Sequence, residues 1–193
     1  IVFGDWSSDV CSSDLKKGTV LISEPFLQDM YFQRSVIFLT EHDKTGSIGF
    51  IINKSIPMKI SEVLKNFPNV PVNVGLGGPV KTNTVHYIHT LGDMVPESNH
   101  VMDNIYWGGN FDAIKDLAQK KIATPENTRF FIGYSGWSPK QLEEEISKQS
   151  WIVTKIETSK LFKPTTTIWE DLLKTLGENY KIWLNAPPNP MMN

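Results

Sequence analysis

Runs of β-branched and aromatic residues, separated by turn-forming residues, dominate the first quarter of the chain. Thr19–Ser23 is a short run of this kind, Ser35–Thr40 is a second and Ser47–Asn53 is a third. The second and third runs are joined by the turn-rich stretch 41–46, which ends in a glycine, so they predict an antiparallel hairpin. Because both runs are apolar on both faces, we expect central strands that are covered on both sides.

Helical signals occur in the remainder of the chain. Asn110 precedes apolar residues at helical spacing, so it is expected to cap a helix. Ser138–Gln141 places serine at the N-cap, proline at the first helical position and glutamine three residues after the cap, which predicts a sharp helix start. The predicted helices are a short one over 61–67 with Ser61 as N-cap, one from 111, one from 139, and one from Thr167 to Gly177.

Further strands are predicted where Val, Ile, Tyr and Phe gather. Together with the first three runs they give eight strand regions and four helices in mixed order, which argues against a regular succession of βαβ units. The sequence therefore indicates an α+β fold. The additional strand regions are 69–78 (a strand followed by a loop), 84–90, 101–107, 129–134 and 151–156.

The first 15 residues differ from everything after them. They repeat Ser-Ser-Asp at 7–9 and 12–14, lack helical or strand periodicity, and hold the only cysteine, Cys11. The stretch resembles the translation of a sequencing-adapter read, so we interpret 1–15 as a non-native segment. We expect one domain over 16–185, followed by a frayed, proline-rich tail over 186–193.

Composition excludes several classes of protein. Hydrophobic residues make up 40% of the chain and charged residues 21%, which is typical of a globular domain. The net charge is −2, and without the first 15 residues the balance is 18 acidic to 19 basic residues, so the basic excess of a nucleic-acid-binding protein is missing. No apolar run approaches the roughly 18 residues of a membrane span. A single cysteine and no secretory pattern predict a cytoplasmic protein.

Three separated motifs carry a resemblance to a known family. They are Phe32–Val36 leading into Gly49–Lys54, then Gly77–Val80, and then Gly133–Trp137 followed by Gln141–Ile146. In this order the set resembles the YqgE/AlgH family of bacterial proteins, and the likeness extends from about Gly18 to Trp183.

The resemblance implies a bifurcated, mostly antiparallel β-sheet that closes into a pseudo-barrel with helices packed outside, in a bacterial cytoplasm. The family is often labelled a transcriptional regulator, but the biochemical activity behind that label is not established, and its motif residues have no assigned catalytic role. At the C-terminus this chain departs from the family, because Asn185–Asn189 replaces an Ala-Gly-His-Ala-like ending.

Most candidate sites do not meet the requirements of the chemistry that they suggest. Gly75–Val80 lacks the third glycine and the following helix of a dinucleotide loop, so its glycines are expected to permit a tight turn. Ser135 resembles a nucleophile elbow, but Trp137 stands where the elbow has glycine. His86 and His89 point to opposite faces of one strand and cannot share a metal. We predict no catalytic residue, no metal site and no cofactor.

One patch does combine suitable groups, because all its segments lie at or after strand ends. If those ends converge, they line a concave surface with an amide, backbone N–H groups and aromatic rings, which suits a small molecule or a peptide. Alternatively, the same residues only fix the corners of strands. The predicted patch consists of Asn53, Lys54, Gly77, Gly78, Pro79, Tyr134, Ser135, Gly136, Trp137 and Gln141.

These observations leave the biochemical function open. The leading hypothesis is a non-enzymatic regulatory or binding protein whose partner is an unknown protein or small molecule. One alternative is an enzyme that acts on a small metabolite at the same patch. The other is a regulator that binds DNA directly, although the chain lacks two adjoining helices joined by a short glycine turn.

Overall fold

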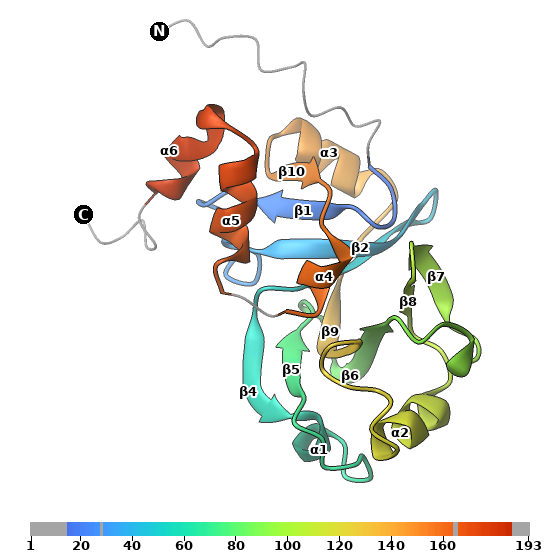
Figure 1. The fold of residues 1–193 in the computed structure, drawn as a ribbon. Coiled ribbons are helices and arrows are strands. Elements are labelled where there is room, and N and C mark those ends of the chain that lie inside the picture. The colour runs from blue at the N-terminus through green and yellow to red at the C-terminus, as the bar shows by residue number, and fades with distance from the viewer. Residues whose placement is uncertain (1–14, 28, 164–165, 187–193) are drawn as a thin grey trace, which may run out of the picture.

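The computed structural model describes residues 15–186, with the exceptions of Gln28 and residues 164–165 (Figure 1). Most of the segment interpreted as non-native, and the tail from 187 onward, lie outside the described residues. The two residues that border them are buried: Leu15 packs in an apolar cluster with Leu21 and Leu142, and the carbonyl of Ala186 accepts a hydrogen bond from Arg34.

The core of the fold is a branched, mostly antiparallel sheet with helices around it. The strand order is β10-β1-β2-β3-β9-β6-β8-β7, and β5 joins β9 in parallel and carries β4 on its other side. The strands are β1 (Val20–Ser23), β2 (Val36–Asp43), β3 (Gly46–Ile51), β4 (Ser55–Lys59), β5 (Asn73–Leu76), β6 (Val80–His89), β7 (Asn99–Met102), β8 (Ile105–Trp107), β9 (Thr128–Trp137) and β10 (Trp151–Thr154).

The branch point is β9, which changes partners along its length. Its last residues, Ser135–Trp137, pair with β3, whereas Phe131 and Ile132 pair with β5 and the stretch 128–134 pairs with β6. This confirms the expected α+β class and the bifurcation. Within the described residues the end strands β10 and β7 do not pair with each other, so the sheet is open and not closed into a barrel.

The predicted hairpin is confirmed in β2 and β3. The two strands run antiparallel with Ile37 opposite Ile51, and only Lys44 and Thr45 separate Asp43 from Gly46. The first five residues of β2 are buried, as expected for a covered strand.

Two helices cover opposite faces of this part of the sheet, and alternate residues of β1 and β2 point to each. Ile22 and Phe38 pack with α5, whereas Leu21 and Ile37 pack with α3. Figure 1 shows α5 in front of β1 and β2, and α3 behind them. The helices are α1 (Ile60–Val63), α2 (Phe111–Gln119), α3 (Gln141–Ser147), α4 (Thr158–Leu161), α5 (Ile168–Thr175) and α6 (Lys181–Leu184), with single 3₁₀ turns at Gly92–Met94 and Glu178–Tyr180.

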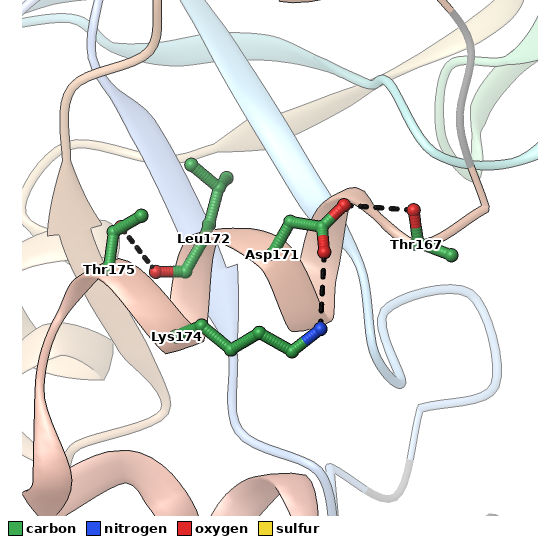
Figure 2. A network of polar contacts seen from close by, with 5 residues as sticks. All are labelled: Thr167, Asp171, Leu172, Lys174 and Thr175. Atoms are coloured by element: carbon green, nitrogen blue, oxygen red, sulfur yellow. Dashed lines mark hydrogen bonds and ion pairs between the residues drawn. The ribbon is translucent and has the colours of Figure 1, made fainter.

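Helix α5 shows how one element divides its two faces. Trp169 and Leu173 are buried against the sheet. On the exposed face, the carboxylate of Asp171 accepts hydrogen bonds from the Thr167 hydroxyl at 2.9 Å and from Lys174 at 3.3 Å (Figure 2). These contacts lie three and four residues apart, the spacing at which helical neighbours meet.

Local boundaries differ from the predictions where backbone geometry or pairing decides them. The predicted strand over 101–107 is two strands, because Asp103 adopts a positive φ of 45° and reverses the chain. Helix α1 begins at Ile60, with Lys59 and not Ser61 at the N-cap. The N–H of Lys59 donates to the carboxylate of Glu62 at the start of this helix. Strand β4 was not predicted.

Candidate functional site

The three motifs meet where the glycine segment crosses β9. The N–H of Ile51 donates to the carbonyl of Gly77 at 3.0 Å, and the N–H of Gly77 donates to Ile132 at 2.8 Å. The Ser135 hydroxyl donates to the same Gly77 carbonyl at 3.0 Å. A Cβ at Gly77 would overlap the carbonyl of Gly133, and one at Gly78 would overlap the backbone of Tyr134. The glycines therefore permit two backbones to cross in contact.

Two of the predicted patch residues hold a neighbouring loop. The side chain of Asn53 accepts from the N–H of Val36 at 2.9 Å and donates to the carbonyl of Arg34 at 2.7 Å. The ammonium of Lys54 donates to the carbonyls of Met30 and Tyr31, and burial lowers its pKa. Both side chains tie the segment before β2 to the end of β3.

A hollow of about 380 Å³ lies beside the end of β9. Tyr134, Gly136 and Trp137 of the predicted patch line it, together with residues of the β2–β3 hairpin that sequence reasoning missed. The hairpin could have been suspected only from its pairing with β9, which no local pattern reveals. The additional lining residues are Glu41, Thr45, Gly46, Ser47, Ile48, Val80, Ser138 and Pro139.

Among the described residues, Glu41 is the only charged one that lines this hollow. Burial raises the pKa of its carboxyl, and the nearby Asp43 raises it further, while Lys17 opposes both effects. A carboxylate in such surroundings gains stability from a cation placed beside it. The hollow thus combines one acidic group with aromatic and proline surfaces.

The other predicted patch residues lie elsewhere. Ser135 is fully buried, and Pro79 is exposed outside the lining of the hollow. The Gln141 side-chain oxygen accepts from the N–H of Ser138, and its amide donates to the carboxylate of Glu145 at 2.9 Å. The structure therefore places Tyr134, Gly136 and Trp137 in one hollow. Gly77, Gly78 and Ser135 belong to the backbone crossing beside it, and Gln141 contacts Ser138 and Glu145. Asn53 and Lys54 do not line the hollow, because they hold the segment before β2 at the other end of β3.

The carboxylate of Glu145 joins α3 to the aromatic side chains beside the hollow. One of its oxygens accepts from the indole N–H of Trp137 at 2.9 Å and from that of Trp151 at 2.7 Å. The two indoles meet edge to face, and Phe32 contacts both. This network holds the ring of Trp137, which is only 6% exposed, in the cluster under α3 next to the hollow.

The histidines divide into buried and accessible environments. His89 is fully buried; its Nδ1 accepts from the N–H of Leu91, and its Nε2 contacts Ser98 and Gly108. His86 lies among aromatic rings. His42 contacts the hydroxyl of Ser47 at 2.8 Å, which makes it the histidine that meets the lining of the hollow.

In the described part of the chain, no three His, Cys, Asp or Glu side chains gather as a metal site requires. No helix in the same residues combines the length and apolar character needed to cross a bilayer.

Comparison with known proteins gives a consistent result. A family model described as AlgH-like matches residues 20–181. A UPF0301 protein of Cytophaga hutchinsonii is 40% identical over 181 residues, which is 93% of this chain and 100% of that protein. One from Parabacteroides distasonis is 39% identical over 180 residues, covering 92% of this chain and 91% of the relative.

Solved structures share the fold at lower identity. The solution structure of the AlgH protein from Pseudomonas aeruginosa has a TM-score of 0.71 and 23% identity, covering 89% of this chain and 94% of that chain. The crystal structure of protein DIP2367 from Corynebacterium diphtheriae has a TM-score of 0.72 and 22% identity, covering 88% and 91%.

Proposed function

Since this chain belongs to the AlgH-like family, we propose that it is a non-enzymatic, regulatory binding protein of the bacterial cytoplasm that takes up a partner segment in the hollow beside Tyr134. The observation that carries this proposal is the composition of the hollow: aromatic and proline surfaces beside a single carboxylate. The matching partner segment is a peptide that places an apolar side chain against the rings and a Lys or Arg beside Glu41.

The shape of the hollow favours a peptide over a small molecule. Its lining comes from the β2–β3 turn and from the end of β9, so it lies open along the rim of the sheet. The side chain of Trp137 is held by Glu145 and packed against Trp151, so the end of β9 that lines the hollow is already in place before a partner binds. A preformed wall lowers the ordering cost of association.

The test uses peptides displayed on phage, with random sequences of roughly ten residues, which is long enough to span such a hollow. Selected peptides should be enriched in Lys or Arg next to an apolar residue, and they should shift the amide NMR signals of Gly136 and Ser47. The variant Glu41→Gln should weaken binding by about tenfold, the effect of one partly buried charge pair. Glu143→Gln, on an exposed position of α3, is the matched control.

Two outcomes would contradict the proposal. One is selection of peptides without a basic residue, or peptides whose affinity is the same for Glu41→Gln and the parent chain. The other is tight, salt-dependent binding of duplex DNA to the isolated chain, because regulation would then act through direct contact with nucleic acid.

One contact favours an enzyme as the second candidate. His42 Nδ1 lies 2.8 Å from the Ser47 hydroxyl, at the hollow, which is the distance at which a base can activate a nucleophile. If the chain is such an enzyme, it should hydrolyse an activated ester such as p-nitrophenyl acetate. This hydrolysis should be lost in both Ser47→Ala and His42→Gln. Equal rates for the parent and both variants would exclude it.

A further inference from the structure

Arg129 is a buried cation at the start of β9. Only 7% of its surface is exposed. Its guanidinium donates to the carbonyl of Leu161 at 2.9 Å and to the carbonyl of Ile52, and it lies over the ring of Phe131 at 5.2 Å from the centroid. These contacts fix the side chain between the end of β3 and the end of α4.

None of these contacts neutralises the charge. In the described residues no carboxylate lies within ion-pair distance of Arg129. Burial lowers its pKa to about 10, so the group still carries its proton at neutral pH. Buried charges in proteins are normally paired, because an unpaired one loses its hydration without an ionic partner.

A second hollow, of about 320 Å³, has Arg129 in its lining. Ser55 and Phe162 belong to its lining, and they closely follow Ile52 and Leu161, whose carbonyls hold the guanidinium. The charged end of Arg129 therefore lies at the hollow. In the part of the lining that the structure describes, Arg129 is the only charged residue, and the others are Ser55, Pro71, Val72, Asn73, Gly75, Pro125, Thr128 and Phe162.

We propose that this hollow binds a small organic anion, a metabolite with a carboxylate or phosphate group, and that Arg129 recognises that group. A guanidinium has more N–H groups than its two backbone contacts use, and they are arranged to match the oxygens of a carboxylate or phosphate. Ser55 and Asn73 add a hydroxyl and an amide at the exposed part of the lining. The volume lies at the lower end of the range for small-molecule sites.

The apolar part of the lining sets the size and character of the ligand. The side chains of Val72, Phe162 and two prolines offer a ligand no hydrogen-bond partner. A ligand that consists of one anionic group and a short carbon skeleton fits this division. The two hollows share no lining residue, so failure at one site leaves the other untouched.

The first experiment titrates the full chain with inorganic phosphate, succinate and glycerol 3-phosphate, with sodium chloride at equal ionic strength as the control. Thermal unfolding and the ¹⁵N NMR signal of the Arg129 Nε–H are recorded. We expect a saturable rise in Tm and a shift of that signal with at least one of the three anions and not with chloride. Comparison of the phosphate and carboxylate series shows which group is preferred.

Variants separate a built site from a general effect of salt. Asn73→Asp places a negative charge in the exposed part of the lining, and it should weaken anion binding by about tenfold. Asn104→Asp adds the same charge at an exposed position outside the lining and should leave binding unchanged. Arg129→Lys keeps the charge but loses the planar fork, so it should weaken binding as well.

Three results would overturn the proposal. The first is a rise in Tm that is equal for the anions and for chloride. The second is an equal loss of anion binding in Asn73→Asp and Asn104→Asp. The third is a rise in Tm with anions that persists in a folded Arg129→Lys variant, while the Arg129 NMR signal of the parent chain does not move. If Arg129→Lys does not fold, the pair of asparagine variants decides the question.

Discussion

At the scale of residues, glycines allow two backbone segments to lie in contact beside the candidate site. Gly78 has a φ of 155°, and a Cβ there would overlap the carbonyl of Tyr134 and the N–H group of Ser135. We therefore predict that Gly78→Ala lowers the free energy of unfolding by about 3 kcal/mol, the scale of an overpacked and strained backbone. Urea denaturation followed by circular dichroism measures this change.

A matched glycine provides the control. Gly92 also has a positive φ, of 54°, but a Cβ there meets nothing within 4 Å. Gly92→Ala should cost only about 1 kcal/mol, the conformational term alone. Equal losses for the two variants would show that contact with β9 is not what requires glycine at 78.

We predict that His89 makes the free energy of unfolding depend on pH. Burial lowers its pKa, and the hydrogen bond with Gly108 only partly opposes this. The unfolded chain therefore takes up a proton more readily than the folded chain, so the contribution to stability is complete above about pH 6.5 and is lost as pH falls below it.

We accordingly expect the free energy of unfolding to fall between pH 7.5 and pH 5.5, and to fall less in His89→Gln, which cannot titrate. Urea denaturation at the two pH values measures this difference. The variant His86→Gln must be measured as well, because burial and, to a lesser extent, the charge of Lys81 also lower the pKa of His86. If His89→Gln keeps the whole pH dependence of the parent chain, His89 is not its source.

At the scale of elements, one carboxylate adds hydrogen bonds to the apolar contacts that attach α3 to the sheet. Glu145 accepts from two indole N–H groups and one amide, from Trp137, Trp151 and Gln141. A glutamine at 145 has only one acceptor oxygen, and its NH₂ group cannot accept these donors. We predict that Glu145→Gln lowers the free energy of unfolding by about 2 kcal/mol and changes the tryptophan fluorescence of the folded state.

The comparison for this prediction is Glu144→Gln on the same helix. Glu144 is exposed, and the same substitution there should change stability by less than about 0.5 kcal/mol. Unfolding followed by tryptophan fluorescence separates the two. A similar small effect at both positions would mean that the carboxylate contacts do not hold α3 in place.

The start of α3 shows what the sequence could and could not predict about elements. Ser138–Gln141 correctly indicated a helix, and the N–H of Ser138 does donate to the Gln141 side chain as a capping pair requires. The helix begins at Gln141 because Lys140 adopts a left-handed φ of 66°. Local patterns thus identify an element, while a single backbone dihedral sets its boundary.

At the scale of the whole molecule, β9 joins three apolar clusters that the sequence does not distinguish. Phe131 belongs to the cluster under α5, Phe130 to the cluster with α1 and α2, and Trp137 to the cluster under α3. Burial of each run was predictable from its apolar pattern. The partition among three clusters was not, because it depends on how β9 changes partners along its length.

The same dependence on strand pairing explains which residues of the candidate sites could be predicted from the sequence. Tyr134 and Trp137 were accessible to sequence reasoning because they belong to one ordered motif. Glu41 reaches the same hollow only through the pairing of β3 with β9, and Arg129 meets its hollow only where segments from four parts of the chain converge. No local pattern carries contacts of that kind.

Because β9 is shared, we predict that the described residues unfold as one cooperative unit. Ile22, Ile114 and Ile37 are each fully buried, one in each cluster. The substitution of Val for each removes the same methylene group, so each variant should lower the free energy of one transition by about 1 kcal/mol without changing its urea dependence.

Circular dichroism and tryptophan fluorescence, recorded on the same samples, provide the test. The described tryptophans lie with the clusters under α5 and α3, and none lies in the cluster of Ile114. If Ile114→Val shifts the circular dichroism curve and leaves the fluorescence curve in place, the α1–α2 cluster unfolds separately. Coincident shifts of both curves would instead show that breaking one cluster releases β9 from the other two.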